Sequence, residues 1–343
     1  MKILVLGGTG FVGRALVEEA VGRRWSVTTF NRGQSGRDVP GVDVIRGDRY
    51  RDTDLITLAG TGQWDTVFDC SGYVPGNVLD VSRALSACTA GYVFVSTVSV
   101  YAGWPAEPLT EDSRLLEAPP DAGPDFGVDV EDGPTRYGYQ KAGCEAAVRD
   151  VFGPERCTIL RPGVVLGPRE YVGRLVWWLA RISKGGRVVA PGPADRAIQP
   201  VDVRDLATFA LQCATANHVG DFNVTAPIRS STFGDLLAHC MRVTSGDATL
   251  VWTDDEVLLR CGVRQWSELP LWRVSRGVWE VSSSRAEAVG LSTRPLAETV
   301  ADTWAWMEGG GRIDGRDRAG EVGLSAEREL QLLRCLDVRA GEP

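Results

Sequence analysis

The sequence predicts an α/β protein with a doubly wound parallel sheet and a smaller C-terminal lobe. Residues 2–6 carry a continuous apolar run, which is typical of a central parallel strand covered on both faces. A glycine-rich turn at residues 7–13 follows this strand and leads into a helical pattern. Strand and helix patterns then alternate with short connections, an order that builds a parallel sheet.

The first domain is expected to span residues 1–165. The apolar positions Val12, Leu16, Val17 and Val21 recur at helical spacing, which predicts an amphipathic helix after the glycines. The other helices and strands are predicted from helical spacing and from short apolar runs. We expect strands at 2–6, 26–30, 42–46, 66–69, 92–96 and 157–161, and helices at 11–22, 52–59, 77–90 and 137–152. A further helix is expected at 171–183, just beyond this domain.

After residue 165 the alternation loosens, so residues 166–308 are expected to form mostly a substrate-binding lobe, from which some segments could return to the first domain. Strands are predicted at 187–190, 220–224 and 249–251, and helices at 202–216 and 232–243. Residues 309–343 read as a linker and a final helix near 325–336.

Residues 102–135 interrupt the pattern before the helix at 137–152. Six prolines lie in this stretch among acidic residues. Long irregular segments inside a compact fold are usually functional or mobile. A lid over the site and a disordered surface loop are both open interpretations.

Composition limits the classes of function. The net charge of −8 and the pI near 5.0 argue against a nucleic-acid partner, because such binding needs clustered lysine and arginine. The eight cysteines are scattered and only two histidines are present, so no metal site is expected. No apolar run approaches the roughly 18 residues of a membrane span. We expect a cytoplasmic protein with reduced thiols and no membrane partner.

The glycine turn predicts a bound dinucleotide. Gly7, Gly10 and Gly13 form a G-x-x-G-x-x-G pattern between a buried strand and a helix, as in a Rossmann-type fold. Glycines let the backbone approach a pyrophosphate closely, and the helix N-terminus supplies N–H groups and a favourable dipole. The intervening Thr9, Phe11 and Val12 are included in this candidate cofactor site. A purely structural turn is the alternative.

The end of the second predicted strand bears on which cofactor binds. An acidic residue there would accept hydrogen bonds from the ribose hydroxyls of NAD, but the chain has Asn31 and Arg32 instead. The guanidinium of Arg32 could pair with a 2′-phosphate, which favours NADP over NAD; a solvated arginine is the alternative. Asp48, followed by Arg49, ends the third strand, where a carboxylate could contact adenine or cap the next helix.

The candidate catalytic residues lie around the fifth strand. Tyr137 and Lys141 are four residues apart on a predicted helix and so share a face. A neighbouring ammonium favours the tyrosine phenolate, which would make Tyr137 a usable general acid or base. Hydroxyls at Ser96, Thr97 and Ser99 follow the fifth strand, where parallel sheets bind ligands.

Together these motifs resemble the extended short-chain dehydrogenase/reductase superfamily, in its NAD-dependent epimerase/dehydratase group. The resemblance covers residues 1 to about 308 and includes the motifs at 7–13, 95–101, 137–141, 160–168 and 201–207. It implies that Thr97 is the catalytic hydroxyl, that Ser71 and Gly72 line the cofactor, and that Pro162 flanks the nicotinamide. The chain is most similar to a reductase-like branch, which is also similar to plant chloroplast stem-loop RNA-binding proteins.

Two departures from the sugar-nucleotide epimerases stand out. Sugar-nucleotide epimerases usually have an acidic residue where Asn31 stands. They also have an arginine, just before the motif at 201–207, that binds the diphosphate of the substrate. Arg196 is near that place but two positions off. A sugar-nucleotide substrate is therefore not implied.

Three functions stay open. The leading one is an NADP- or NAD-dependent oxidoreductase that reduces a carbonyl or oxidises an alcohol on a small, secondary-metabolite-like substrate. The second is an epimerase or dehydratase that recycles its cofactor within the site. The third is a non-catalytic cofactor-sensing or RNA-binding protein. A homodimer is compatible with each of them.

Overall fold

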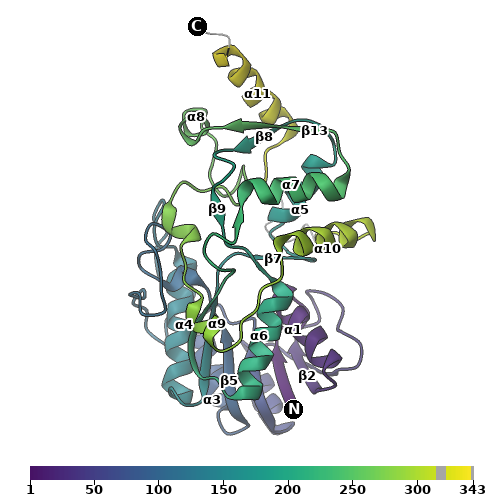
Figure 1. Cartoon of the computed structure of the whole chain (residues 1–343). Helices are drawn as coiled ribbons and strands as arrows, with labels where there is room; N and C mark the ends of the chain where they lie inside the picture. The colour runs from purple at the N-terminus through teal and green to yellow at the C-terminus, as the bar shows by residue number, and fades with distance from the viewer. Residues whose placement is uncertain (314–321, 341–343) are drawn as a thin grey trace. The chain divides into compact units, whose positions relative to one another are not determined.

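The computed structural model describes residues 1–313 and 322–340 (Figure 1). These residues divide into two compact units. The larger unit contains Met1–Val165, Val203–Pro227 and Ser275–Thr293. The remaining residues of the described part, drawn from 166–202, 228–274 and the chain after 293, form the smaller unit.

A seven-stranded parallel sheet forms the centre of the larger unit. Its strand order is β11-β6-β5-β4-β1-β2-β3, and every neighbouring pair is parallel. The central strands are buried on both faces; Ile3, Leu4 and Val5 are fully buried. This confirms the expected fold class. The strands are β1 Lys2–Leu6, β2 Ser26–Asn31, β3 Asp43–Arg46, β4 Trp64–Asp69, β5 Thr89–Val95, β6 Cys157–Pro162 and β11 Gly220–Val224.

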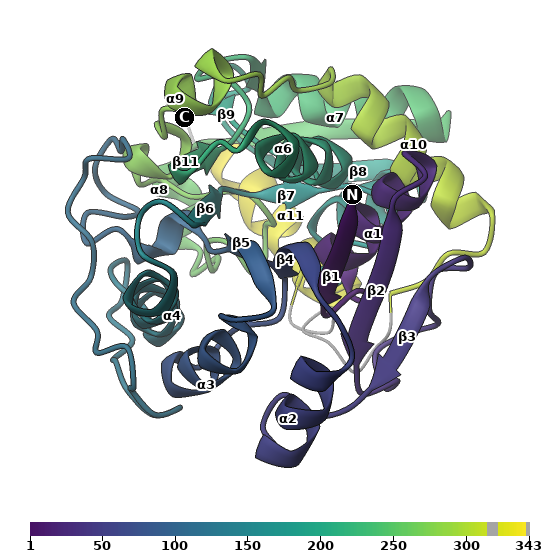
Figure 2. The same ribbon diagram turned by 90° about the horizontal axis from the view of Figure 1, so that it is seen from below.

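Helices cover both faces of this sheet, as Figure 2 shows: α1 and α6 lie on one face, and α2, α3 and α4 lie on the other. Each buries an apolar stripe; α1, for example, buries Leu16, Val17 and Ala20. The helices are α1 Phe11–Gly22, α2 Asp52–Gly60, α3 Pro75–Leu85, α4 Arg136–Phe152, α6 Val203–Ala216 and α9 Ser284–Ala288, with short 3-10 turns η1 Val98–Val100 and η2 Arg276–Trp279.

One helix of the larger unit is shorter than predicted. The helix expected at 77–90 ends at Leu85, because β5 begins at Thr89 and pairs there with Trp64 of β4. Strand pairing overrides local helical propensity at this point.

Some segments after residue 165 were allowed to return to the first domain, and two predicted elements do so. The helix expected at 202–216 is α6, which lies in the larger unit. The strand expected at 220–224 is β11 of the main sheet and pairs with β6.

The smaller unit is built from helices and short strand pairs. Strands β8 and β13, both expected, pair in parallel, and β9 pairs with β12. The helix α10 was not expected from the sequence. The elements are β8 Gly186–Pro191, β9 Ala197–Ile198, β10 Val201–Asp202, β12 Ser231–Thr232, β13 Ala248–Thr253, α5 Arg174–Ile182, α7 Phe233–Thr244, α8 Asp255–Arg260, α10 Leu296–Glu308 and α11 Ala326–Ala340, and β7 is Val165–Leu166.

The proline-rich segment 102–135 folds against the larger unit. It contains no regular helix or strand, but its backbone is hydrogen-bonded to neighbouring elements: Leu109 N–H donates to the Glu280 carbonyl (2.9 Å), and the Ala122 carbonyl accepts from Gly76 N–H (3.0 Å). Leu109, Leu116 and Ala122 are buried. The segment therefore packs over the N-terminus of α3.

Within residues 1–313 and 322–340, no helix is long and apolar enough to cross a membrane. No group of three His, Cys, Asp or Glu side chains in the same part of the chain is arranged to hold a metal ion.

Candidate active site

The glycine turn joins β1 to α1 at the carboxyl edge of the sheet. Gly7 has φ +86°, a conformation that glycine adopts without strain. A Cβ atom on Gly13 would overlap the Gly7 carbonyl oxygen, so the first turn of α1 can sit this close only with glycine there. Gly10 precedes α1 and no side chain caps the helix. The first N–H groups of a helix point along its axis at the N-terminus, and this is the geometry in which such a turn holds a pyrophosphate.

The remaining residues of the turn pack locally. Thr9 is buried and its hydroxyl is 2.8 Å from the Ser35 hydroxyl, in the loop after β2. Phe11 and Val12 are half-buried at the start of α1.

Asn31 ends β2 and is held by several partners. Its Oδ1 accepts from Gly33 N–H (2.8 Å) and from the Arg46 guanidinium, while its amide donates to Asp38 (3.1 Å). Arg46, at the end of β3, also pairs with Asp38, and this hydrogen bond lowers the pKa of the Asp38 carboxyl. Arg32 is exposed beside this cluster. Sequence reasoning missed Asp38 and Arg46, which no motif marks.

Asp48 closes a short turn instead of capping α2. Its carboxylate accepts from Tyr50 N–H (3.1 Å), and the residue before α2 is Arg51, with no side-chain cap. Of the two interpretations offered for Asp48, helix capping is therefore not seen.

Arg49 is buried in an ion pair with Asp69 at the end of β4. Its guanidinium donates twice to Asp69 (2.8 and 2.9 Å), and also to Ser71 Oγ (2.9 Å) and Asn77 Oδ1 (2.6 Å). Burial would raise the pKa of Asp69, but Arg49 outweighs burial and holds the pKa below its ordinary value. Arg49 thereby fixes Ser71, whose side chain packs against Gly7 of the glycine turn.

The structure brings Thr97 and the start of α4 together. Thr97 is the second residue after β5 and directly precedes η1; its hydroxyl accepts from Ser99 N–H (3.2 Å) and lies 3.3 Å from Ser99 Oγ. The first turn of α4 packs on η1, and a Cβ on Gly138 would overlap the Ser99 carbonyl oxygen. The glycine that follows Tyr137 therefore allows this close approach. Tyr137 is 44% exposed, so its ring can reach a bound molecule.

Lys141 lies one turn further along α4 and is buried. Its ammonium donates to the carbonyls of Gly72 (2.8 Å) and Val95 (2.7 Å), and it lies 4.0 Å from the centre of the Phe94 ring. Burial lowers the pKa of Lys141 below its ordinary value. The same lysine thus ties α4 to the ends of β4 and β5, where the candidate residues meet.

A buried charged network lies directly behind these residues. Glu145 of α4 accepts from the Ser96 hydroxyl (2.6 Å) and from two nitrogens of Arg161 on β6 (2.9 and 2.7 Å). Arg161 also donates to the Tyr101 hydroxyl (2.9 Å), which donates to Asn223 of β11 (2.7 Å). Sequence reasoning missed this network, although a charged residue inside the apolar strand 157–162 was a usable signal.

Pro162 and Arg196 are the other two residues that were singled out from the sequence. Pro162 is buried at the end of β6, beside Gly163, whose N–H donates to the Val224 carbonyl (3.2 Å). Arg196, in the smaller unit, donates to Asp255 (2.5 and 2.6 Å), to the Gly192 carbonyl (2.6 Å) and to the Arg273 carbonyl (2.9 Å).

The comparison with known families agrees with this geometry. Residues 3–225 match the model of the NAD dependent epimerase/dehydratase family. The chain belongs to this family. It is thus an enzyme of the epimerase/dehydratase superfamily, with oxidoreductases among its relatives.

Curated relatives include a 2-alkyl-3-oxoalkanoate reductase from Stenotrophomonas maltophilia (strain K279a), which is 32% identical over 229 residues. That match covers 61% of this chain and 64% of the relative. The chloroplast stem-loop binding protein of 41 kDa b from Arabidopsis thaliana is 26% identical over 226 residues, covering 61% of this chain and 54% of the relative. The chain therefore spans only 54% to 64% of the length of these two relatives.

Among solved structures, WbmH from Bordetella bronchiseptica in complex with NAD+ superposes with a TM-score of 0.68 at 17% identity. The match covers 91% of this chain and 99% of WbmH. At this identity the likeness establishes the fold.

Proposed function

We propose that the chain is an NADP(H)-dependent oxidoreductase that reduces a carbonyl, or oxidises an alcohol, on a small molecule. The observation that carries the proposal is that α4, whose first two turns bear Tyr137 and Lys141, packs at the carboxyl ends of β5 and β4, where Thr97 also lies. Ligands of parallel α/β sheets bind at this edge. The glycine turn supports cofactor binding at the same edge, because it joins β1 to the N-terminus of α1 and its glycines let a pyrophosphate approach the backbone closely.

In this proposal the bound dinucleotide supplies or accepts the hydride. The exposed Tyr137 hydroxyl donates the proton to the substrate oxygen during reduction and takes it back during oxidation. Thr97 donates a hydrogen bond to the same oxygen and so orients the carbonyl. Lys141, one helical turn away, contributes a positive charge that favours the tyrosine phenolate, and it is the residue proposed to contact the nicotinamide ribose.

The residues around Asn31 support the phosphorylated cofactor. Asn31 carries no charge to repel a 2′-phosphate, and Arg32 is exposed next to it. Arg46 contributes a second guanidinium at the same place, although Asp38 neutralises part of its charge. Arginine forms bidentate hydrogen bonds to phosphate, so this loop suits NADP better than NAD.

The other cofactor-site residues have supporting roles in the proposal. Asp48 is proposed to face the adenine, and Ser71, Gly72 and Pro162 to line the ribose and nicotinamide. Arg49 donates hydrogen bonds to Asp69, Ser71 and Asn77, so we propose that it shapes the cofactor site through Ser71. The eight thiols favour a cytoplasmic location.

A recycled-cofactor reaction, as in an epimerase, is the second candidate. The solved structures of similar fold include a UDP-glucose 4-epimerase from Thermotoga maritima. Against a sugar-diphosphate substrate, Arg196 donates its hydrogen bonds to Asp255 and to backbone carbonyls of the smaller unit. The two reductases among the relatives, named for 2-alkyl-3-oxoalkanoate and for 2′-dehydrokanamycin, favour net reduction of a carbonyl.

The test is a carbonyl screen with NADPH and NADH side by side. We expect loss of reduced-cofactor absorbance in step with product, and faster turnover with NADPH. Product formation with no net change in cofactor would instead assign an epimerase or dehydratase. If neither cofactor binds in a fluorescence titration, the proposal is wrong.

A further inference from the structure

Two cysteines of the smaller unit bring their sulfur atoms into contact. Cys261 follows the last turn of α8, and Cys335 lies in the middle of α11. Their Sγ atoms are 3.7 Å apart, although 74 residues separate them along the chain. Both side chains are half-buried. Neither residue belongs to the proposed active site.

The position of Cys335 is set by the way in which α11 packs. Arg328, Leu332 and Cys335 follow one another at intervals of four and three residues, so they share one face of the helix. Arg328 donates to the carbonyls of Cys261 (2.7 Å) and Gly262 (3.3 Å), and Leu332 is 2% exposed. This face of α11 is therefore held against the end of α8, with Cys335 directed at Cys261.

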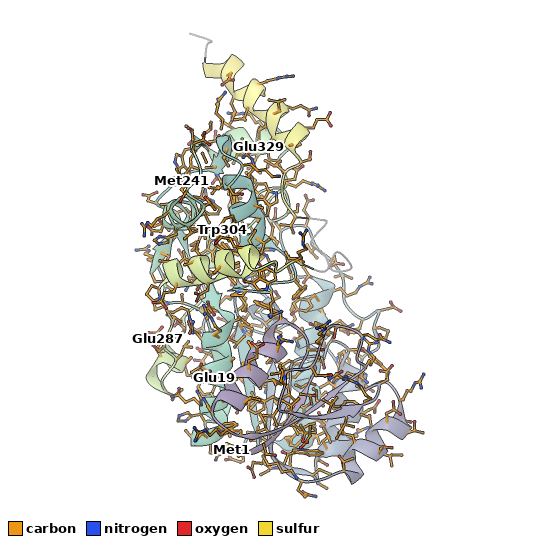
Figure 3. The ribbon with its side chains drawn as sticks, turned by 90° about the vertical axis from the view of Figure 1, so that its right-hand side faces the viewer. Met1, Glu19, Met241, Glu287, Trp304 and Glu329 are labelled. Carbon is orange, nitrogen blue, oxygen red and sulfur yellow. The ribbon has the colours of Figure 1, made fainter. Side chains whose placement is uncertain are left out.

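A second face of α11 is tied to the rest of the smaller unit. Glu329, labelled in Figure 3, accepts from Arg181 of α5 (2.5 Å) and from Val189 N–H of β8 (3.2 Å). Asp337 pairs with Arg187 (2.6 Å). Contacts on both faces fix the rotation of the helix about its axis, so the approach of the two sulfurs follows from several independent contacts.

The helix α11 also forms one wall of a cavity of about 590 Å³. The opposite wall comes from α5 and the start of β8, with Trp177, Arg181 and Lys184, while Leu330 and Leu333 of α11 face it. Any covalent tie on α11 therefore fixes a wall of this cavity.

We propose that Cys261 and Cys335 are a redox-active pair that forms a disulfide and ties α11 to α8. A disulfide needs a sulfur–sulfur distance near 2.05 Å, and side-chain rotation of a touching pair can supply the remaining approach. This inference goes beyond the proposed oxidoreductase function and does not depend on it.

The chemistry balances with a small-molecule disulfide such as oxidised glutathione as the oxidant. The thiolate of one cysteine attacks a glutathione sulfur, and the first glutathione thiolate leaves. The thiolate of the second cysteine then attacks the mixed disulfide and releases the second glutathione thiolate. The two protons lost by the cysteines pass through solvent to the two released glutathione thiolates, and the protein's two electrons reduce one glutathione disulfide to two thiols. A reduced dithiol reverses both steps.

The other cysteines are poor competitors for the oxidant. Burial raises the pKa of Cys70, Cys144 and Cys213 to about 12 in each case, which withholds the reactive thiolate. Cys157 has its pKa raised to about 11 for the same reason, and burial raises that of Cys240 as well. The sixth, Cys88, is buried and its thiol donates to the Ala59 carbonyl (3.3 Å), so an oxidant has little access to it. Oxidation under mild conditions should thus be selective for the pair.

The test equilibrates the full chain with mixtures of oxidised and reduced glutathione and counts thiols after denaturation. We expect the eight thiols to fall to six, with one cross-linked peptide that contains Cys261 and Cys335. The cross-link should also raise the melting temperature of the oxidised protein, because it restricts the unfolded chain. Reduction should restore all eight thiols.

Cys335→Ser provides the negative control and should show neither the cross-link nor the rise in melting temperature. Cys70→Ser removes another half-buried cysteine and should leave both unchanged. Separate glutathione adducts on Cys261 and Cys335, a cross-link between two chains, or eight surviving thiols under strongly oxidising mixtures would each overturn the proposal.

Discussion

Two ion pairs of this protein, one in each unit, differ in how far their charges are buried. In the larger unit, Arg161 and Glu145 are fully buried and hydrogen-bonded to each other behind the candidate catalytic residues. In the smaller unit, Arg187 and Asp337 are about half exposed and join the C-terminal helix to β8. A buried pair is costly to break, because the remaining charge has no water to solvate it, whereas an exposed pair contributes little.

The buried pair lies next to the candidate catalytic residues, whereas the exposed pair does not. The buried pair links α4, β5 and β6, the elements that carry Tyr137, Thr97 and Pro162, so that these elements hold a single arrangement. The exposed pair secures a helix that carries no proposed catalytic residue. The buried pair therefore restrains the carboxyl edge of the main sheet, where a reaction would need fixed side chains.

The most disruptive change predicted by this comparison is Arg161→Met. It leaves Glu145 buried beside an apolar side chain, and we expect a loss of about 3–5 kcal/mol of folding stability. The matched substitution Arg187→Met in the smaller unit should leave the melting temperature almost unchanged. Thermal unfolding of both variants measures the difference in stability between them. Equal losses of stability would show that burial does not determine how much each ion pair contributes to folding.

A second prediction concerns pH. The pKa of Asp69 is lowered in the folded protein, so its contribution to stability is complete above its unfolded value near 3.8 and is lost as pH falls through the lower folded value. Asp69→Asn removes this contribution and leaves Arg49 without its carboxylate. We expect lower stability at neutral pH and a flatter acid limb below pH 3.8, measured by urea unfolding at several pH values. An acid limb identical to that of the wild type would exclude Asp69 as its source.

A smaller effect is expected at the proposed 2′-phosphate site. Arg32→Ala removes an exposed guanidinium, and hydrogen bonds to charged groups contribute about 1.5–3 kcal/mol. The affinity for NADPH should therefore fall about 10- to 100-fold, while that for NADH stays unchanged. Arg23→Ala, at the far end of α1, is the control. An equal loss for both cofactors would remove the argument for NADP.

Much of the larger unit could be predicted from the sequence, because its strands are continuous apolar runs and its glycine turn has a single structural solution. The strand β1, the helix α1 and the spacing of Tyr137 and Lys141 all follow from local patterns. The strands β8 and β13 could also be predicted, because each is a short apolar segment between turns and its signal lies within the segment itself.

What could not be predicted depends on partners distant in the chain. The strand β11 joins the main sheet only because β6 offers a free edge, and nothing within residues 220–224 indicates this. The Arg46–Asp38 pair needs β3 and the loop after β2 to meet. Cys261 and Cys335 look like two scattered cysteines until α11 packs on α8.

The most direct test of the central claim is Tyr137→Phe, compared with Tyr139→Phe, which changes the same residue type two positions along α4. Tyr139 packs against Phe126 and is not part of the proposed set. With a substrate found in the carbonyl screen, we predict that Tyr137→Phe lowers turnover by about 10²- to 10⁴-fold, while NADPH affinity stays as in the wild type. Tyr139→Phe should retain turnover. Wild-type turnover in Tyr137→Phe would contradict the account.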